Sequence, residues 1–320
     1  MTLAPHRIMR LPAETPGSSE ITLRDDETPM STVSELLRRG ARSLESRSDS
    51  PRLDAELLLG KILGLSRPGL IARGNEPVAS ERESDFASLI EQRLKGMPIA
   101  YLTGSREFWS LALRVTPAVL VPRPETELLV ELALQHLPEH QAGPSADRAC
   151  SILDLGTGSG AIALAIASER PRARITAVDI SPSALEVAVQ NSRDLGLGHV
   201  DWRLGSWFAP VPGERFDVIV ANPPYVAAAD PALERLWAEP AIALCDGPKG
   251  LEALSAIIGA AAPHLHPHGW LILEHGSNQA PDVAQLLERH GFTQVRSHLD
   301  FSGKPRATLG TVHSPPQETT

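Results

Sequence analysis

The stretch Ser151-Ile-Leu-Asp-Leu-Gly-Thr-Gly-Ser-Gly160 joins a short apolar run to a glycine-rich loop, and a helical pattern follows it. Glycines let the backbone approach a ligand closely, and the start of the next helix offers N–H donors. The following apolar run ends in Asp179, an acid placed to accept hydrogen bonds from ribose hydroxyls. The pattern predicts a site for a nucleoside-containing cofactor, made by Gly156, Thr157, Gly158, Ser159, Gly160 and Asp179.

The spacing of the glycines distinguishes two kinds of cofactor. The loop reads Asp-x-Gly-x-Gly-x-Gly, whereas dinucleotide-binding loops read Gly-x-Gly-x-x-Gly. This difference favours S-adenosylmethionine, whose cationic amino-acid end suits carboxylate neighbours better than a pyrophosphate cradle does. The alternative is a tight strand–helix turn without a ligand, but the strand, loop, helix and acid together argue against it.

Strand and helix patterns alternate from Cys150 onward, which is typical of βαβ units and a mainly parallel sheet. Two late apolar runs have no helix between them and predict a closing antiparallel pair. The predicted strands cover 151–155, 174–179, 200–204, 216–221, 270–274, 292–299 and 306–312, and the main predicted helices cover 160–169, 183–195, 251–261 and 281–290.

A second motif, Asn222-Pro223-Pro224-Tyr225, follows the predicted strand 216–221. Proline fixes φ and has no N–H, so the carbonyls of this turn project without a local donor. The turn therefore offers acceptors and a flat aromatic face to a planar NH2 group. Amide side chains and nucleobases both carry such a group, and the motif alone leaves both open.

The segment before the α/β pattern divides into two parts. Apolar residues recur at helical spacing over 31–95 and predict a small helical bundle. Prolines and glycines punctuate 96–123, which predicts a linker that forms a β-hairpin. The α/β domain is expected to cover 124–313, with residues 1–30 and 314–320 as disordered ends.

Composition restricts the possible partners. The 320 residues carry a net charge of −9, which weighs against binding mainly through phosphates, and no apolar run approaches the length of about 20 residues that crosses a bilayer. Cys150 and Cys245 match no metal or redox spacing, so we expect reduced thiols in a cytoplasmic protein. His264, His266 and His268 alternate around prolines, which favours an exposed loop over a metal site.

Seven segments carry a resemblance to one known family. They are 96–110 in the linker, Val121-Pro-Arg-Pro-Glu-Thr126, the 154–160 loop, the Asn222–Tyr225 turn, Glu239-Pro240, Leu273-Glu-His-Gly276 and Ala307-Thr-Leu-Gly310. Over roughly residues 31–312 the chain resembles the release-factor glutamine methyltransferases, the HemK/PrmC family, within the class I S-adenosylmethionine-dependent fold. That fold is Rossmann-like, with a mainly parallel sheet.

The resemblance implies a set of roles. The 156–160 loop and Asp179 would bind S-adenosylmethionine, with Trp207 beside the adenine, although a core aromatic is the alternative for Trp207. Asn222 would touch both cofactor and substrate, and Asn222, Pro223, Pro224 and Tyr225 would hold the substrate glutamine. The substrate would be the Gly-Gly-Gln loop of class I peptide chain release factors. The helical domain would dock this partner, and the enzyme would act as a cytoplasmic monomer without nucleic acid or membrane.

Two other functions are compatible with parts of the pattern. Adenine-N6 methyltransferases of nucleic acids share the Asn-Pro-Pro-Tyr turn, but this chain is acidic and shows no basic aromatic insert for a flipped base. A non-catalytic binding module is the second alternative, and the intact loop and turn argue against it.

Three short segments leave their roles open. Trp237-Ala238 departs from the family, which often has an arginine and an aromatic residue there, so a substrate contact from this loop is in doubt. Glu125 and Thr126 lie at a helix start, where capping and pocket lining are both possible. For Glu274-His275 a structural or capping role is favoured over general-base work.

Overall fold

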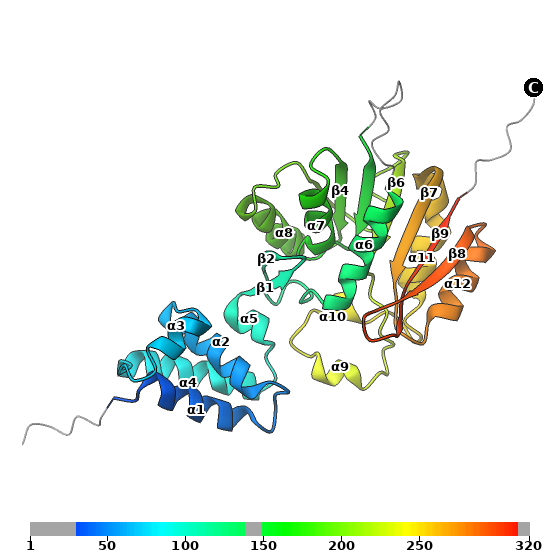
Figure 1. Cartoon of the computed structure of the whole chain (residues 1–320). Coiled ribbons are helices and arrows are strands. Elements are labelled where there is room, and N and C mark those ends of the chain that lie inside the picture. Colours follow the sequence, from blue (N-terminus) through cyan, green and yellow to red (C-terminus); the bar gives the residue numbers. More distant parts are fainter. Residues whose placement is uncertain (1–29, 138–148, 313–320) are drawn as a thin grey trace, which may run out of the picture.

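The structure, a computed structural model, describes residues 30–137 and 149–312 (Figure 1). It contains an N-terminal helical region, a short linker and a larger α/β domain. The disorder predicted for 1–30 and 314–320 concerns, apart from Met30, residues outside the described part of the chain. None of the helices in the two described ranges is both long and apolar enough to cross a membrane.

The N-terminal helices follow from capping and periodicity. They are α1 (Val33–Leu44), α2 (Pro51–Leu63), α3 (Arg67–Ala72) and α4 (Ser80–Leu94). Thr32 starts α1 with a capping box, and Gly64 ends α2 in the left-handed conformation with φ 67°. Leucines such as Leu36 and Leu58 fill a core of their own. The predicted bundle is confirmed, although α3 was missed because six residues are too few to show a period.

The linker contains the predicted hairpin and one additional helix. Helix α5 (Ile99–Thr103) precedes strands β1 (Ser105–Phe108) and β2 (Leu111–Arg114), which pair antiparallel. Trp109 and Ser110 make the two-residue turn with φ of 50° and 58°, as such hairpin turns require.

A seven-stranded sheet of order β5-β4-β3-β6-β7-β9-β8 forms the α/β domain. Strands β3 to β7 pair parallel, and β9 pairs antiparallel with both of its neighbours, which confirms the mainly parallel sheet with an antiparallel end. The strands are β3 (Ser151–Leu155), β4 (Arg174–Asp179), β5 (Asp201–Leu204), β6 (Phe216–Ala221), β7 (Leu265–Glu274), β8 (Thr293–Leu299) and β9 (Pro305–Thr311).

Helices cover both faces of the sheet (Figure 1). Successive residues of β3 point to opposite faces, so Ile152 belongs to the core beside α6 and α7, and Leu153 to the core beside α11 and α12. The elements are η1 (Pro124–Thr126), α6 (Glu127–His136), α7 (Ala161–Glu169), α8 (Pro182–Asp194), α9 (Ala232–Arg235), α10 (Ala241–Leu244), α11 (Glu252–Ala261), η2 (Ala262–His264) and α12 (Ala280–Arg289).

The exposed loop predicted for the alternating histidines is wrong. His264 ends η2, where its ring stacks on Phe208 with centroids 4.6 Å apart, and His266 and His268 lie on β7. Strand β7 begins at Leu265, which is buried and pairs with Phe216, and a register shift follows before Trp270 pairs with Val218. No cluster of metal-ligating side chains occurs within residues 30–137 and 149–312.

The order of the strands decides where a ligand binds. The chain runs outward from β3 through β4 to β5, then returns to the other side of β3 with β6. In such sheets ligands bind beyond the carboxyl ends of the strands at this reversal. The ends of β3 and β6 are the places where the glycine-rich loop and the Asn-Pro-Pro-Tyr turn begin.

Candidate active site

A cavity of about 440 Å³ opens beyond the carboxyl ends of β3, β4 and β6. Predicted residues that line it are Gly156, Thr157, Ser159, Asp179, Trp207, Asn222 and Pro224. Gly158, Gly160, Pro223 and Tyr225 are not among its lining residues. The loop and the turn, distant in sequence, thus face one space, and the predicted roles can be examined residue by residue.

The glycine-rich loop is shaped by packing as well as by ligand access. Gly160 has φ 83°, and a Cβ there would lie 2.9 Å from Trp202 Cη2. Glycine is therefore required at this position by the helix–sheet contact. The loop is also tied to the next strand, because the Gly158 N–H donates to Asp179 Oδ2 at 2.8 Å.

Two buried carboxyls support the loop. Asp154 Oδ2 accepts from the Thr157 hydroxyl at 2.6 Å and from the Ala163 N–H at 3.2 Å. Burial raises the pKa of Asp154 to about 7. Burial also raises the pKa of Asp179, whose Oδ1 accepts from the Ser181 N–H at 2.8 Å. Asp154 lies behind the loop, whereas Asp179 reaches the cavity.

Trp207 lies where the cavity meets the core. It lines the cavity, and its ring also packs against the core under α11 and α12. Its φ of 45° lies in the left-handed region, which is uncommon for a bulky residue and marks a site where the surroundings hold the backbone. Contact with an adenine stays a prediction.

The amide of Asn222 is held by a residue that the sequence left open. Its Nδ2 donates to Thr126 Oγ1 at 3.1 Å, across 96 residues of sequence. Thr126 is buried, lines the cavity and precedes α6. With Nδ2 directed to Thr126, the Asn222 Oδ1 remains as an acceptor for a ligand.

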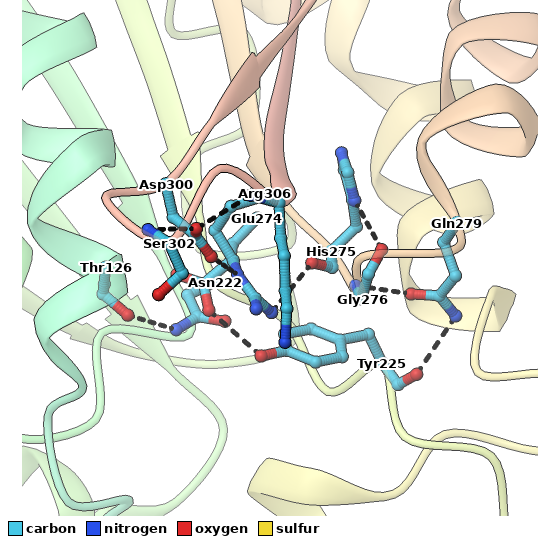
Figure 2. A network of polar contacts seen from close by, with 11 residues as sticks. Thr126, Asn222, Tyr225, Glu274, His275, Gly276, Gln279, Asp300, Ser302 and Arg306 are labelled. Atoms are coloured by element: carbon cyan, nitrogen blue, oxygen red, sulfur yellow. Dashed lines mark hydrogen bonds and ion pairs between the residues drawn. The ribbon is translucent and has the colours of Figure 1, made fainter.

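Tyr225 is placed behind the turn by a polar network (Figure 2). Its hydroxyl donates to Glu274 Oε1 at 3.1 Å, and its carbonyl accepts from Gln279 Nε2 at 3.1 Å. Burial raises the pKa of the Tyr225 hydroxyl, so it is a donor. The ring packs against the core near α11, and its contact with a substrate amide stays a prediction.

An ion pair between the half-buried Arg123 and the buried Glu239 joins two segments that line the cavity. The Glu239 carboxylate accepts from the Arg123 guanidinium and, at 3.0 Å, from the Val121 N–H. Trp237, at the departure from the family pattern, instead packs beside the linker, where a Cβ on Gly96 would lie 3.0 Å from Trp237 Nε1. It is not among the residues that line the cavity.

The parallel sheet, the glycine-rich loop and the Asn-Pro-Pro-Tyr turn around one cavity define a class I methyltransferase. A solved structure titled as the hMettl16 catalytic domain in complex with an RNA hairpin has the same fold, with a TM-score of 0.51 and 14% identity over 65% of this chain and 77% of that chain.

Sequence comparisons identify the family. A "PrmC N-terminal domain" family model matches residues 35–104, and a "Methyltransferase domain" model matches 146–291. The release factor glutamine methyltransferase of Xylella fastidiosa (strain Temecula1) is 47% identical, covering 81% of this chain and 92% of the relative. That of Salmonella typhimurium is 45% identical, covering 82% and 93%. The chain belongs to the release factor glutamine methyltransferase family.

Proposed function

We propose that this protein transfers a methyl group from S-adenosylmethionine to the N5 amide nitrogen of a glutamine, the one in the Gly-Gly-Gln motif of class I peptide chain release factors. The observation that carries the proposal is that Asn222 and the glycine-rich loop line the same cavity. Membership of the family supplies the substrate class.

The charges of the cavity suit the proposed cofactor. Asp179, Asp246 and Glu252 line it, and Arg123 is the basic residue among its described lining residues. A surplus of acids fits the sulfonium and ammonium groups of S-adenosylmethionine and opposes a pyrophosphate. When bound, this cofactor supplies a methyl group activated on a sulfonium. The 156–160 loop, Asp179 and Asn222 would hold it, with Trp207 beside its adenine.

The turn would orient the substrate amide. An amide nitrogen is a weak nucleophile because its lone pair is shared with the carbonyl, so orientation is the main task of the enzyme. Asn222 Oδ1 and the Pro223 carbonyl would accept the two N–H bonds of the substrate. These acceptors also stabilise the positive charge that develops on nitrogen during transfer. The proton then leaves to water, and no dedicated base is needed.

The remaining parts of the proposal concern partners and place. The helical domain of 31–95 would dock the release factor, and the linker of 96–123 would connect it to the catalytic domain of 124–313. We further propose a cytoplasmic monomer that does not act on nucleic acid, which is consistent with the net charge of −9.

Mass spectrometry of a purified release factor tests the proposal directly. After incubation with enzyme and S-adenosylmethionine, we expect a mass gain of one CH2 on the glutamine of Gly-Gly-Gln. Labelling of DNA or ribosomal RNA instead would establish the adenine-N6 alternative. Binding of labelled cofactor without transfer to any of these substrates would establish a binding module.

Asp179→Asn should weaken binding of S-adenosylmethionine at least about tenfold, because a charged acceptor is lost and the new NH2 would face the N–H of Gly158 or Ser181. Isothermal titration calorimetry measures this change. Asp194→Asn is the matched control, since Asp194 is exposed at the end of α8 in the same domain. Equal affinities for both variants would contradict a cofactor role for Asp179.

A further inference from the structure

Glu274 is a buried carboxyl directly beneath the catalytic turn. It ends β7 and is 1% exposed. Oε1 accepts from the Tyr225 hydroxyl, whereas Oε2 makes no hydrogen bond with any described residue. Since buried carboxyl oxygens normally have partners, Oε2 is an open acceptor for a nearby donor. Figure 2 shows Glu274 in the same group of side chains as Asn222 and Tyr225.

Thr126 carries a second hydroxyl near this carboxyl. It accepts from Asn222 Nδ2, and it lies close enough to Glu274 to lower the pKa of that carboxyl. A hydroxyl has one proton to donate and two lone pairs. One lone pair of Thr126 is used by Asn222, and its proton is available to Glu274.

The orientation of the Asn222 amide depends on where that proton goes. A hydroxyl can accept from an amide NH2 or donate to an amide oxygen, so contact with Thr126 alone allows two orientations of Asn222. If the Thr126 proton is committed to a carboxylate, Thr126 is an acceptor toward Asn222. Asn222 must then turn Nδ2 to Thr126 and Oδ1 to the cavity.

We propose that the ionised Glu274 is a positioning residue for methyl transfer: it accepts from the hydroxyls of Thr126 and Tyr225 and thereby makes Asn222 present its oxygen to the substrate amide. In this proposed arrangement Asn222 Nδ2 donates to Thr126 Oγ1, and the Thr126 hydroxyl donates to the open Oε2 of Glu274. The identity of the substrate amide rests on the proposed function, but the orientation of Asn222 is a property of the enzyme alone.

Protonation of Glu274 reverses the direction of the hydrogen bonds between Asn222, Thr126 and Glu274. Its Oε2 proton would be donated to Thr126, and the Thr126 proton would then be donated to Asn222 Oδ1. The NH2 of Asn222 would face the NH2 of the substrate, and two donors repel each other. The ionised form is therefore the active form, and kcat should rise with increasing pH.

The charges around Glu274 set the pH range. Burial raises the pKa of Glu274 to about 7, and the negative charge of Glu125 on η1 acts in the same direction. The hydroxyls of Thr126 and Tyr225 and the charge of Arg306 on β9 act in the opposite direction and lower this pKa. Burial lowers the pKa of the neighbouring His275, which favours its neutral form. The active fraction should thus increase through about pH 7.

An NMR experiment on the enzyme alone tests the orientation. The Asn222 side-chain NH2 signals, assigned by their loss in Asn222→Ala, should shift with a midpoint near pH 7. In Glu274→Gln they should not shift, because an amide at 274 directs its NH2 toward Thr126 at every pH. Signals that do not titrate, or that titrate equally in Glu274→Gln, would overturn the proposal whatever the substrate is.

Kinetics with the full-length enzyme and a release factor test the consequence. At pH 8, Glu274→Gln should lower kcat about tenfold and flatten its rise with pH, with KM nearly unchanged, since transition-state orientation is lost rather than binding. Saturating cofactor is needed because Asp154 also titrates near 7. Thr126→Val should match Glu274→Gln, and Thr126→Ser should restore turnover.

Thr311→Val is the control for a structural effect. Thr311 is a buried threonine on β9 whose hydroxyl donates to the carbonyls of Gly269, at 2.9 Å, and Val312, at 3.5 Å. The variant therefore loses buried hydroxyl contacts without changing the hydrogen bonds of Asn222, Thr126 and Glu274. Normal kcat and an unchanged pH profile in Glu274→Gln would overturn the proposal. If the wild-type enzyme methylates no release factor, the proposed function fails, while the NMR result still decides the orientation of Asn222.

Discussion

Asn222→Ala should lower kcat by about 10²- to 10³-fold, the effect typical of removing one preorganised group that stabilises developing charge. The Asn222 Oδ1 is the acceptor left toward the cavity, because Nδ2 is bound to Thr126. Affinity for S-adenosylmethionine should fall less, since the glycine-rich loop and Asp179 are untouched. Single-turnover transfer from labelled cofactor to a release factor measures the first quantity, and calorimetry measures the second.

The control for Asn222→Ala is Asn278→Ala. Asn278 is exposed beyond the end of β7, so the same change in chemistry there leaves the cavity intact. We expect its kcat to equal that of the wild type. Near-normal turnover in Asn222→Ala, at a cofactor concentration that saturates both variants, would show that the turn does not orient the substrate amide.

The strands that hold the site could be predicted residue by residue. The predicted bounds 151–155, 174–179 and 216–221 agree with β3, β4 and β6. Strands buried on both faces are continuous apolar runs, and here turn residues end each run, so the sequence marks both limits. The helices α5, α9 and α10 were missed because four or five residues show no period and tertiary contacts decide their structure.

Only the parts of the site that form local sequence motifs could be predicted. The loop and the turn each lie within a few consecutive residues, so spacing alone identified them. Their supports come from distant parts of the chain: Gln279 is 54 residues from Tyr225, and Thr126 is 96 from Asn222. Thr126 and Glu274 were recognised as element ends, but nothing in one sequence states which distant residues they contact.

Gly250 also supports the Asn222–Tyr225 turn, although no motif in the sequence marks it. Its substitution by alanine gives the second large expected effect. It has φ 68°, and a Cβ there would lie 2.1 Å from the Tyr225 carbonyl oxygen and 2.7 Å from its carbon. Such a clash with backbone cannot be relieved by a side-chain rotation. Gln279 Nε2 donates to the carbonyls of both Gly250 and Tyr225, so the two segments are held together.

Gly250→Ala should therefore displace the turn. We expect the free energy of unfolding to fall by about 2–4 kcal/mol, from overpacking together with the strain of a positive φ. We also expect kcat to fall at least about tenfold in the molecules that remain folded, because misplacement of catalytic groups by about an ångström has this effect or a larger one. Chemical denaturation and methyl-transfer assays below the midpoint measure the two changes.

Gly196→Ala separates the clash from the strain. Gly196 follows α8 in the same domain with φ 69°, and a Cβ there would have nothing within 4 Å. Its backbone strain matches that of Gly250→Ala, so it should cost about 1 kcal/mol of stability and leave kcat unchanged. Equal losses of stability and of kcat in the two variants would mean that the contact between residue 250 and Tyr225 does not affect either quantity. A larger loss for Gly250→Ala assigns the difference to the position of the turn over Glu274.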